Sequence, residues 1–190
     1  MIEINPNHDK VMIKSRDVII NDSTIMDSDN RCVMEITEKA IMIEQANQIA
    51  FKGADILELG FGMGLSALAI QNHKPKSHTI VEAHPKILKK LYEWAKDRPS
   101  VKVIEGYWHL NIDLFEQYDG IFFDTYRDPY DKQFFANYEL WLNPGGKFTF
   151  YNPDFYGRVP LYFKDNDKLE LIKTKHKIYD YYIPILTKSL

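Results

Sequence analysis

The feature that most constrains the fold is an alternation of short apolar runs with helical segments, which begins after Gly53. Runs typical of strands alternate with helical patterns, and this order predicts right-handed βαβ units in a mostly parallel sheet with helices on both faces. Two further strands, possible partners in a hairpin, are expected near the end of the chain, at residues 168–188. The sequence therefore predicts an α/β fold with a doubly wound, mostly parallel sheet of seven strands.

The chain of 190 residues is expected to form one domain, residues 1–190, in three parts. Residues 1–30 are expected to form an N-terminal arm or lid, with a hairpin or extended segment at residues 10–20 and a polar loop at 21–30. Residues 31–52 follow a helical pattern and are expected to form a helix on the substrate side. Residues 53–190 carry the predicted sheet.

Composition and charge argue against several classes of protein. The N-terminal segment lacks the basic and apolar regions of a signal peptide, and no apolar run approaches the roughly 20 residues that cross a membrane. The net charge of −3 disfavours a nucleic-acid binder. Cys32 is the single cysteine, so no internal disulfide is possible. A cytoplasmic protein without nucleic-acid or membrane partners is expected, either a monomer or a homodimer.

Three predicted strands end in residues suited to a nucleoside ligand. Ligands of doubly wound sheets bind beyond the carboxyl ends of the strands. The first strand ends in "ILELGFGMGLS", whose glycines permit a tight turn and a close approach of the backbone. Glu82 ends the second strand and is suited to ribose hydroxyls, while Tyr107 and Trp108 after the third could flank an adenine. The three ends together predict S-adenosylmethionine as cofactor.

A nicotinamide cofactor is the alternative for these strand ends. The glycine spacing is G-x-G-x-G rather than the G-x-G-x-x-G of dinucleotide-binding folds. Glu58 before the glycines and "NPGG" before the fifth strand also favour S-adenosylmethionine. Five of the six histidines, at 73, 78, 84, 109 and 176, are scattered without ligand spacing, so no metal is expected and most of these side chains are expected at the surface.

Several motifs resemble those of guanidinoacetate N-methyltransferase and of the fungal arginine N-methyltransferases that modify the internal guanidino nitrogen. They are "VMEITEKAIM", "ILELGFGMGLSALAIQ", "VEAHP", "FFDTY", "NPGGKFTFYN" and "YYIPILTK", and the likeness covers roughly residues 33–190. The resemblance implies a class I, Rossmann-like methyltransferase.

The resemblance also implies functional residues. Asp124 and Glu38 would be the catalytic pair and would grip a guanidino group. Asn152, Pro153 and Asp154 would touch the far end of the substrate. Independently of the resemblance, the ring of Tyr126 is a candidate for stacking on the guanidino plane, with core packing as the alternative. The cofactor would be bound by Met34, Met42, Glu58, Gly60, Phe61, Gly62, Met63, Gly64, Leu65, Ser66, Glu82, Ala83, His84, Gly106, Tyr107, Trp108 and Asp124.

The residue pattern gives an independent argument for the acid pair. If residues 31–52 form one helix, Met34, Glu38 and Met42 lie in one line on one face of it. A carboxylate on an apolar stripe is unusual unless it is paired. A guanidinium, which is planar and has five N–H donors, suits two facing carboxylates. The competing interpretations are that Glu38 reaches solvent and that Asp124 caps the following turn.

The sequence thus predicts an enzyme that transfers a methyl group from S-adenosylmethionine to a guanidino nitrogen of a small molecule, such as guanidinoacetate or arginine. A small substrate is favoured because the chain shows no added recognition domain. The alternatives are a protein arginine N-methyltransferase of the internal-nitrogen type and a non-catalytic module that binds S-adenosylmethionine.

Overall fold

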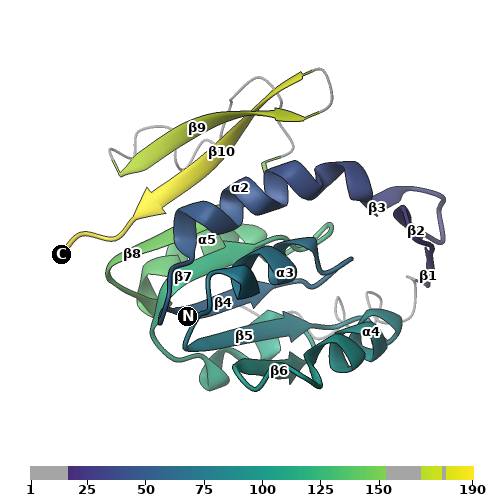
Figure 1. The fold of residues 1–190 in the computed structure, drawn as a ribbon, viewed down its shortest axis with the longest axis horizontal. Helices are drawn as coiled ribbons and strands as arrows, with labels where there is room; N and C mark the ends of the chain where they lie inside the picture. The colour runs from purple at the N-terminus through teal and green to yellow at the C-terminus, as the bar shows by residue number, and fades with distance from the viewer. Residues whose placement is uncertain (1–16, 153–167, 177–178) are drawn as a thin grey trace.

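A computed structural model describes residues 17–152, 168–176 and 179–190 and shows two β-sheets (Figure 1). The larger sheet has seven strands in the order β6-β5-β4-β7-β8-β10-β9. Its first five strands in the chain pair in parallel, and β10 pairs antiparallel with β8 and β9. The seven strands are β4 (Asp55–Leu59), β5 (Ser77–Glu82), β6 (Val101–Glu105), β7 (Tyr118–Phe123), β8 (Leu142–Phe150), β9 (Leu169–His176) and β10 (Tyr179–Thr187).

The strand order confirms the predicted doubly wound fold. From β4 the chain adds β5 and then β6 on one side, and it returns to add β7 on the other side of β4. The strand order therefore reverses between β4 and β7. Ligands of such sheets bind at the carboxyl ends of the strands beside this reversal. The site is therefore expected beyond the ends of β4, β5 and β7.

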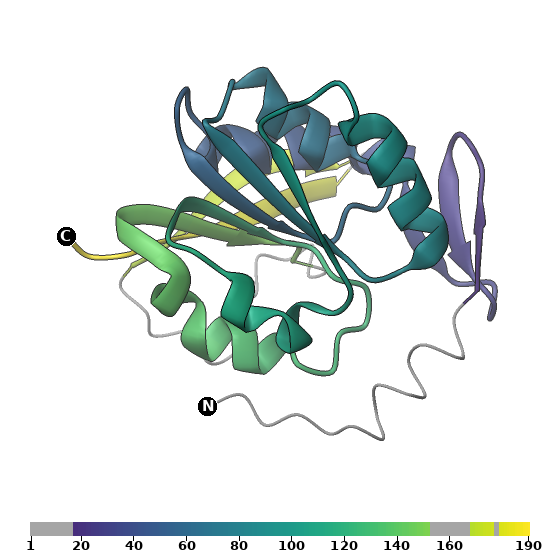
Figure 2. The ribbon, with the colours of Figure 1, turned by 90° about the horizontal axis from the view of Figure 1, so that it is seen from below.

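Helices cover both faces of the large sheet. Helices α2 (Lys39–Ile49), α3 (Leu65–Asn72) and α4 (Pro85–Ala95) lie on one face, and α5 (Asp131–Asn137) lies on the other (Figure 2). Apolar side chains form one buried cluster on each face; the cluster under α5 is rich in aromatic rings, including Phe123, Phe134 and Phe148. Of the helices in the described ranges, none has the length and apolar character needed to cross a membrane.

Four short 3-10 helices complete the described part of the chain. Segment η1 (Ile36–Glu38) leads into α2, while η2 (Trp108–Leu110) and η3 (Ile112–Leu114) follow β6. Segment η4 (Tyr138–Trp141) joins α5 to β8.

The second sheet corrects two predictions for the N-terminal part. Strands β1 (Val18–Ile20), β2 (Thr24–Asp27) and β3 (Cys32–Glu35) form an antiparallel sheet. The expected polar loop at 21–30 therefore contains a strand, because Ile25 is fully buried in the core beneath it. The expected helix at 31–52 begins only at Lys39, because residues 32–35 pair with β2.

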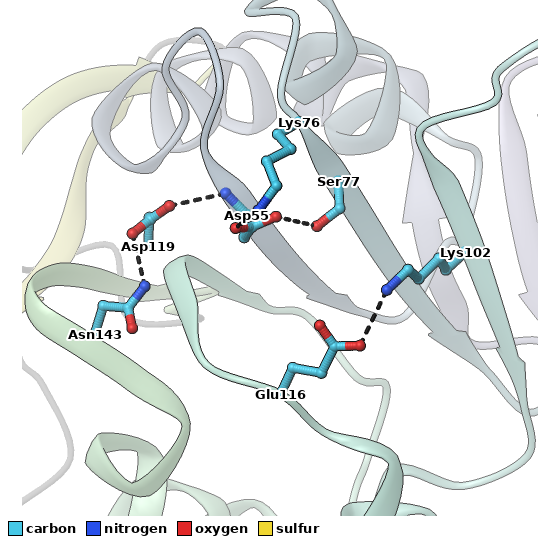
Figure 3. A network of polar contacts seen from close by, with 7 residues as sticks. All are labelled: Asp55, Lys76, Ser77, Lys102, Glu116, Asp119 and Asn143. Carbon is cyan, nitrogen blue, oxygen red and sulfur yellow. Dashed lines mark hydrogen bonds and ion pairs between the residues drawn. The ribbon is translucent and has the colours of Figure 1, made fainter.

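A polar network ties together the amino ends of the strands, at the edge opposite the expected site (Figure 3). Asp119 accepts hydrogen bonds from the backbone N–H of Asp55 at 2.9 Å and from the side-chain amide of Asn143 at 2.8 Å. Asp55 in turn accepts from Ser77 at 2.6 Å and pairs with Lys76 at 2.8 Å. These bonds fix β4, β5, β7 and β8 relative to one another.

Candidate active site

The glycine loop after β4 brings the ends of β4 and β7 into contact. Gly60 has a φ of +91°, which favours glycine, and a Cβ built on it would lie 2.2 Å from the carbonyl oxygen of Asp124. The backbone N–H of Asp124 donates to the carbonyl of Leu59 at 3.0 Å. Gly62 also has a positive φ, and a Cβ there would lie 2.6 Å from the sulfur of Met34. Asp124 and Met34 therefore both pack closely on the loop, and the backbone contact at Gly60 excludes a side chain there.

A cavity of about 390 Å³ opens at the carboxyl ends of β4, β5, β6 and β7. It is lined by ten of the predicted site residues: Gly60, Gly62, Glu82, Ala83, His84, Gly106, Tyr107, Trp108, Asp124 and Tyr126. The remaining lining residues were not predicted: Asp17, Val18, Asp27, Val33, Leu59, Val81, Pro85, Lys86, Ile87, Thr125 and Asp128.

Glu82 is buried at the end of β5 and holds the glycine loop. One carboxylate oxygen accepts the backbone N–H of Phe61 at 3.0 Å, and the other accepts those of Ala83 at 2.8 Å and His84 at 2.7 Å. Burial raises the pKa of Glu82, and these three hydrogen bonds oppose the shift. A carboxylate has about four acceptor positions, so about one is left for a ligand hydroxyl. The ribose contact stays a prediction.

The predicted adenine end is anchored by Asp128, which the sequence reading missed. The indole N–H of Trp108 donates to Asp128 Oδ2 at 2.5 Å, and the hydroxyl of Thr125 donates to the same oxygen at 3.0 Å. The backbone N–H of Tyr130 donates to Asp128 Oδ1 at 2.8 Å. Asp128 therefore fixes the loop after β7 against the loop after β6.

The small N-terminal sheet forms one wall of the cavity, and side chains of α4 and of the loop after β7 attach it to the rest of the protein. Lys86, in the first turn of α4, pairs with Asp17 at 2.6 Å and donates to the carbonyl of Val18 at 3.0 Å. Tyr126 donates its hydroxyl to Asp27 Oδ2 at 3.2 Å. Tyr126 thus links β2 to the loop that carries Asp124, a contact that the predicted stacking role did not include.

A fully buried polar group lies beneath the glycine loop. Ser66, in the first turn of α3, donates to Glu58, and His78 Nε2 lies 2.8 Å from the other carboxylate oxygen of Glu58. Glu58 and His78 have no exposed surface. The expectation that most histidines lie at the surface is therefore wrong for His78. It is also wrong for His109, which is buried with its ring centroid 4.1 Å from that of Tyr130. Their burial lacked a sequence signal because it depends on neighbouring strands and loops.

Asp124 lies directly after β7 and is surrounded by negative charge. Burial raises the pKa of its carboxyl group to about 7, and Glu38 and Glu58 act in the same direction. Glu38 is buried at 9% exposure in η1, immediately before α2. Its Oε1 accepts the backbone N–H of Glu35 at 3.1 Å. The structure therefore brings the two predicted acids close enough to interact, although Glu38 does not line the cavity described above.

The helical-stripe argument for Glu38 is wrong in its geometry. Met34 belongs to β3, Glu38 to η1 and Met42 to α2, so the three do not share one helix face. Met34 nevertheless reaches the glycine loop, since the backbone N–H of Met63 donates to its sulfur at 3.3 Å. Met42 is fully buried in the apolar core.

The other predicted site residues are placed as follows. Phe61 is buried against Trp94, with ring centroids 5.4 Å apart, and its ring lies under Gly64. Leu65 is the first residue of α3. Asn152 is buried, and its backbone N–H donates to the hydroxyl of Tyr181 at 2.8 Å. Pro153 and Asp154 lie outside the described residues.

The cavity suits the predicted cofactor. Val81, Ile87 and Trp108 supply apolar surface for a purine, and Glu82 keeps acceptor capacity beside them. The carboxylate of Asp124 lies at the same cavity and suits a cationic sulfonium. A doubly wound sheet with these strand ends defines an S-adenosylmethionine-dependent methyltransferase. More specifically, residues 18–170 match the family model of guanidinoacetate N-methyltransferase, and the chain belongs to that family.

Curated relatives agree with this assignment. Protein arginine N-methyltransferase 2 of Yarrowia lipolytica is 30% identical over 155 residues, which are 70% of this chain and 32% of the relative. The Saccharomyces cerevisiae protein of the same name is 31% identical over 140 residues, which are 69% of this chain and 33% of the relative. The chain spans about a third of the length of these relatives.

Among solved structures, a methyltransferase from Pyrococcus furiosus has a TM-score of 0.60 at 16% identity and covers 97% of this chain and 96% of its own. Precorrin-6y C5,15-methyltransferase from Geobacter metallireducens also has a TM-score of 0.60, at 14% identity, covering 80% of this chain and 87% of its own. These likenesses support the fold. The family and the fold together imply the use of S-adenosylmethionine.

Proposed function

We propose that this methyltransferase modifies a guanidino nitrogen of a small molecule, such as guanidinoacetate or arginine. The observation that carries the proposal is the half-buried Asp124 at the cavity, whose pKa of about 7 reflects desolvation of its carboxyl group and the nearby charges of Glu38 and Glu58. Three clustered carboxylates favour a cation, because an opposite charge offsets the repulsion among them. A guanidinium pairs with carboxylates through parallel hydrogen bonds and matches this arrangement.

Methyl transfer to a guanidino group requires removal of a proton. A free guanidinium has a pKa above about 12, so the attacking nitrogen has no lone pair to spare. S-adenosylmethionine supplies an electrophilic methyl group. In the proposed reaction the nitrogen would form its bond to the methyl carbon as the bond from that carbon to sulfur breaks and the thioether product leaves. Asp124 would accept the proton that the nitrogen loses. A base with a pKa near the working pH is the most effective acceptor.

Glu38 holds the substrate in this proposal. Its Oε1 is oriented by the backbone N–H of Glu35, which fixes the carboxylate at the start of α2. With Asp124 as proton acceptor, Glu38 keeps positive charge on the nitrogens that do not react. Much of the remaining rate enhancement would come from positioning, with the nitrogen about 3 Å from the methyl carbon.

Methylation of arginine in a protein is the second candidate. The support for this candidate is that two curated relatives, at 30% and 31% identity to this chain, are both named protein arginine N-methyltransferase 2. The acid pair recognises the guanidino group in either case. The two candidates differ in what is attached to the other end of that group.

A panel of acceptors tests both candidates. Purified protein is incubated with S-adenosylmethionine labelled in the methyl group and with guanidinoacetate, free arginine or an arginine-containing peptide. Glycine and lysine serve as controls that carry an amine but no guanidino group. We expect label in a free guanidino compound and none in the controls. Label in the peptide alone would favour the second candidate, and no label in any guanidino compound would contradict both.

A further inference from the structure

Tyr151 lies beside Asp124 at the carboxyl ends of two neighbouring strands. Phe123 and Phe150 are register partners at the ends of β7 and β8, and Asp124 and Tyr151 are the next residues. The backbone N–H of Tyr151 donates to the carbonyl of Phe123 at 3.1 Å. The two residues therefore leave the sheet at the same level, on adjacent strands.

The side chain of Tyr151 points toward the face that carries Glu38. Phe150 belongs to the aromatic cluster under α5, whereas Tyr151 packs against the opposite cluster under α2. This follows from strand alternation, in which residues two apart share a face. Thr149, two residues before Tyr151, lies on the α2 face, since its hydroxyl accepts a hydrogen bond from Gln45 of α2 at 3.1 Å. A second bond from Gln45 to the carbonyl of Phe150, at 2.8 Å, fixes α2 against the end of β8.

The pKa of the Tyr151 phenol is affected by both Glu38 and Asp124. Burial raises the pKa of Tyr151, and Glu38 and Asp124 raise it further. The hydroxyl group is therefore neutral throughout the physiological range. The Tyr151 side chain is half-buried, and its ring packs on Tyr181 with centroids 6.0 Å apart.

The arrangement leaves a gap in the hydrogen bonding of a guanidinium. The cation has five N–H donors on a substituted guanidino group. Paired side-on through two parallel hydrogen bonds each, the two carboxylates take four of these N–H groups, so one N–H is left without an acceptor. Glu38 Oε1 also accepts the N–H of Glu35. A further carboxylate would add charge to a site that already has three. A neutral hydroxyl oxygen provides an acceptor without that charge.

We propose that Tyr151 is a substrate-contacting residue whose hydroxyl oxygen accepts a guanidino N–H that Asp124 and Glu38 do not take. This inference rests on the proposed function, since it needs a guanidino substrate at the acid pair. Tyr181 supports the arrangement, because its ring packs on Tyr151 and its hydroxyl accepts the backbone N–H of Asn152 at 2.8 Å.

The test is Tyr151→Phe, which removes the hydroxyl oxygen and keeps the ring. With the guanidino compound that the wild-type protein methylates, we expect KM to rise about three- to tenfold, the range for loss of one neutral hydrogen bond. The rate constant kcat should change much less, because the contact is present before and during the reaction. The Kd for S-adenosylmethionine should stay the same, which also shows that the variant is folded.

Tyr182→Phe is the matched control, because Tyr182 follows Tyr181 in β10 and points to the other face of the sheet. It should leave KM unchanged. Inhibition by guanidinium and by acetamidinium gives a second readout. Acetamidinium has fewer N–H donors, so the wild-type protein should bind guanidinium more tightly and Tyr151→Phe should reduce that preference.

Two outcomes separate this inference from the proposed function. A wild-type protein that methylates a guanidino compound, with Tyr151→Phe unchanged in KM and in inhibitor preference, overturns the role of Tyr151 alone. A wild-type protein that methylates no guanidino compound overturns both.

Discussion

The indole N–H of Trp108 donates a hydrogen bond to Asp128 at 2.5 Å, which joins the loop after β6 to the loop after β7. Both residues line the cavity. Because Asp128 also accepts from Thr125 and from the backbone of Tyr130, it connects the predicted adenine end to the loop that carries Asp124. The Trp108 side of the cavity and the loop that carries Asp124 are therefore held by the same carboxylate.

Replacing Asp128 with alanine should weaken cofactor binding. The change leaves the buried indole N–H without its acceptor, and an unsatisfied buried donor costs about 1–3 kcal/mol. We expect the Kd for S-adenosylmethionine, measured by calorimetry, to rise about tenfold. Asp113→Ala, at an exposed acid in η3, is the control and should bind normally. Equal Kd values for Asp128→Ala and the control would show that the anchor is dispensable.

A methyl group at Gly60 should disrupt the contact between β4 and β7. A Cβ there would lie 2.2 Å from the carbonyl oxygen of Asp124, at a φ of +91°. Strain and overpacking together should lower the free energy of unfolding by about 2–5 kcal/mol.

Gly53→Ala is the control for Gly60→Ala, because it introduces the backbone strain of a positive φ without a steric clash. Gly53 has a φ of +86°, and nothing lies within 4 Å of a Cβ built on it. Its substitution should cost only about 1–2 kcal/mol. Denaturant unfolding of the two variants measures the difference, and equal losses would argue against the steric role of Gly60.

The alternation of strands and helices was sufficient to predict the large sheet, because buried parallel strands form apolar runs that stand out between helical patterns. The strand-end rule then located Gly60, Glu82 and Asp124. The small sheet was missed because β2 lies within a polar stretch and is defined by pairing with β1 and β3. The spacing of Met34, Glu38 and Met42 fits a helix, but the pairing of residues 32–35 with β2 prevails over that local pattern.

Contacts between distant segments explain what the sequence did not reveal about the site. Asp128 acts through Trp108, 20 residues away, and Lys86 acts through Val18, 68 residues away. Neither residue belongs to a motif whose spacing indicates this role. Tyr151 was within a recognised motif, but its relation to Asp124 and Glu38 depends on the register of β7 and β8.

The stability of the unliganded protein should respond to pH through Asp124. Its native pKa of about 7 is above the ordinary value of 3.8, so the native state binds this proton more tightly than the unfolded state. The contribution of the protonated acid to stability is fully present below about pH 4 and is lost as the pH rises through about 7.

Asp124→Asn keeps this position neutral at every pH. Relative to the wild-type protein, it should gain about 2 kcal/mol of stability between pH 5 and pH 8 after allowance for solvent screening. Thermal unfolding of both proteins at the two pH values measures this gain. A difference in Tm that is the same at pH 5 and pH 8 would mean that the acid is not perturbed.

The central claim is that Asp124 accepts the proton from the substrate nitrogen, and the rate of methyl transfer by Asp124→Asn tests it most directly. The assay uses saturating S-adenosylmethionine and the guanidino compound that the wild-type protein methylates, with binding of the cofactor checked by its effect on Tm. We predict that cofactor binding persists while the rate falls by about 100-fold or more, as expected for loss of a general base. A rate within about threefold of the wild-type value would contradict this role for Asp124.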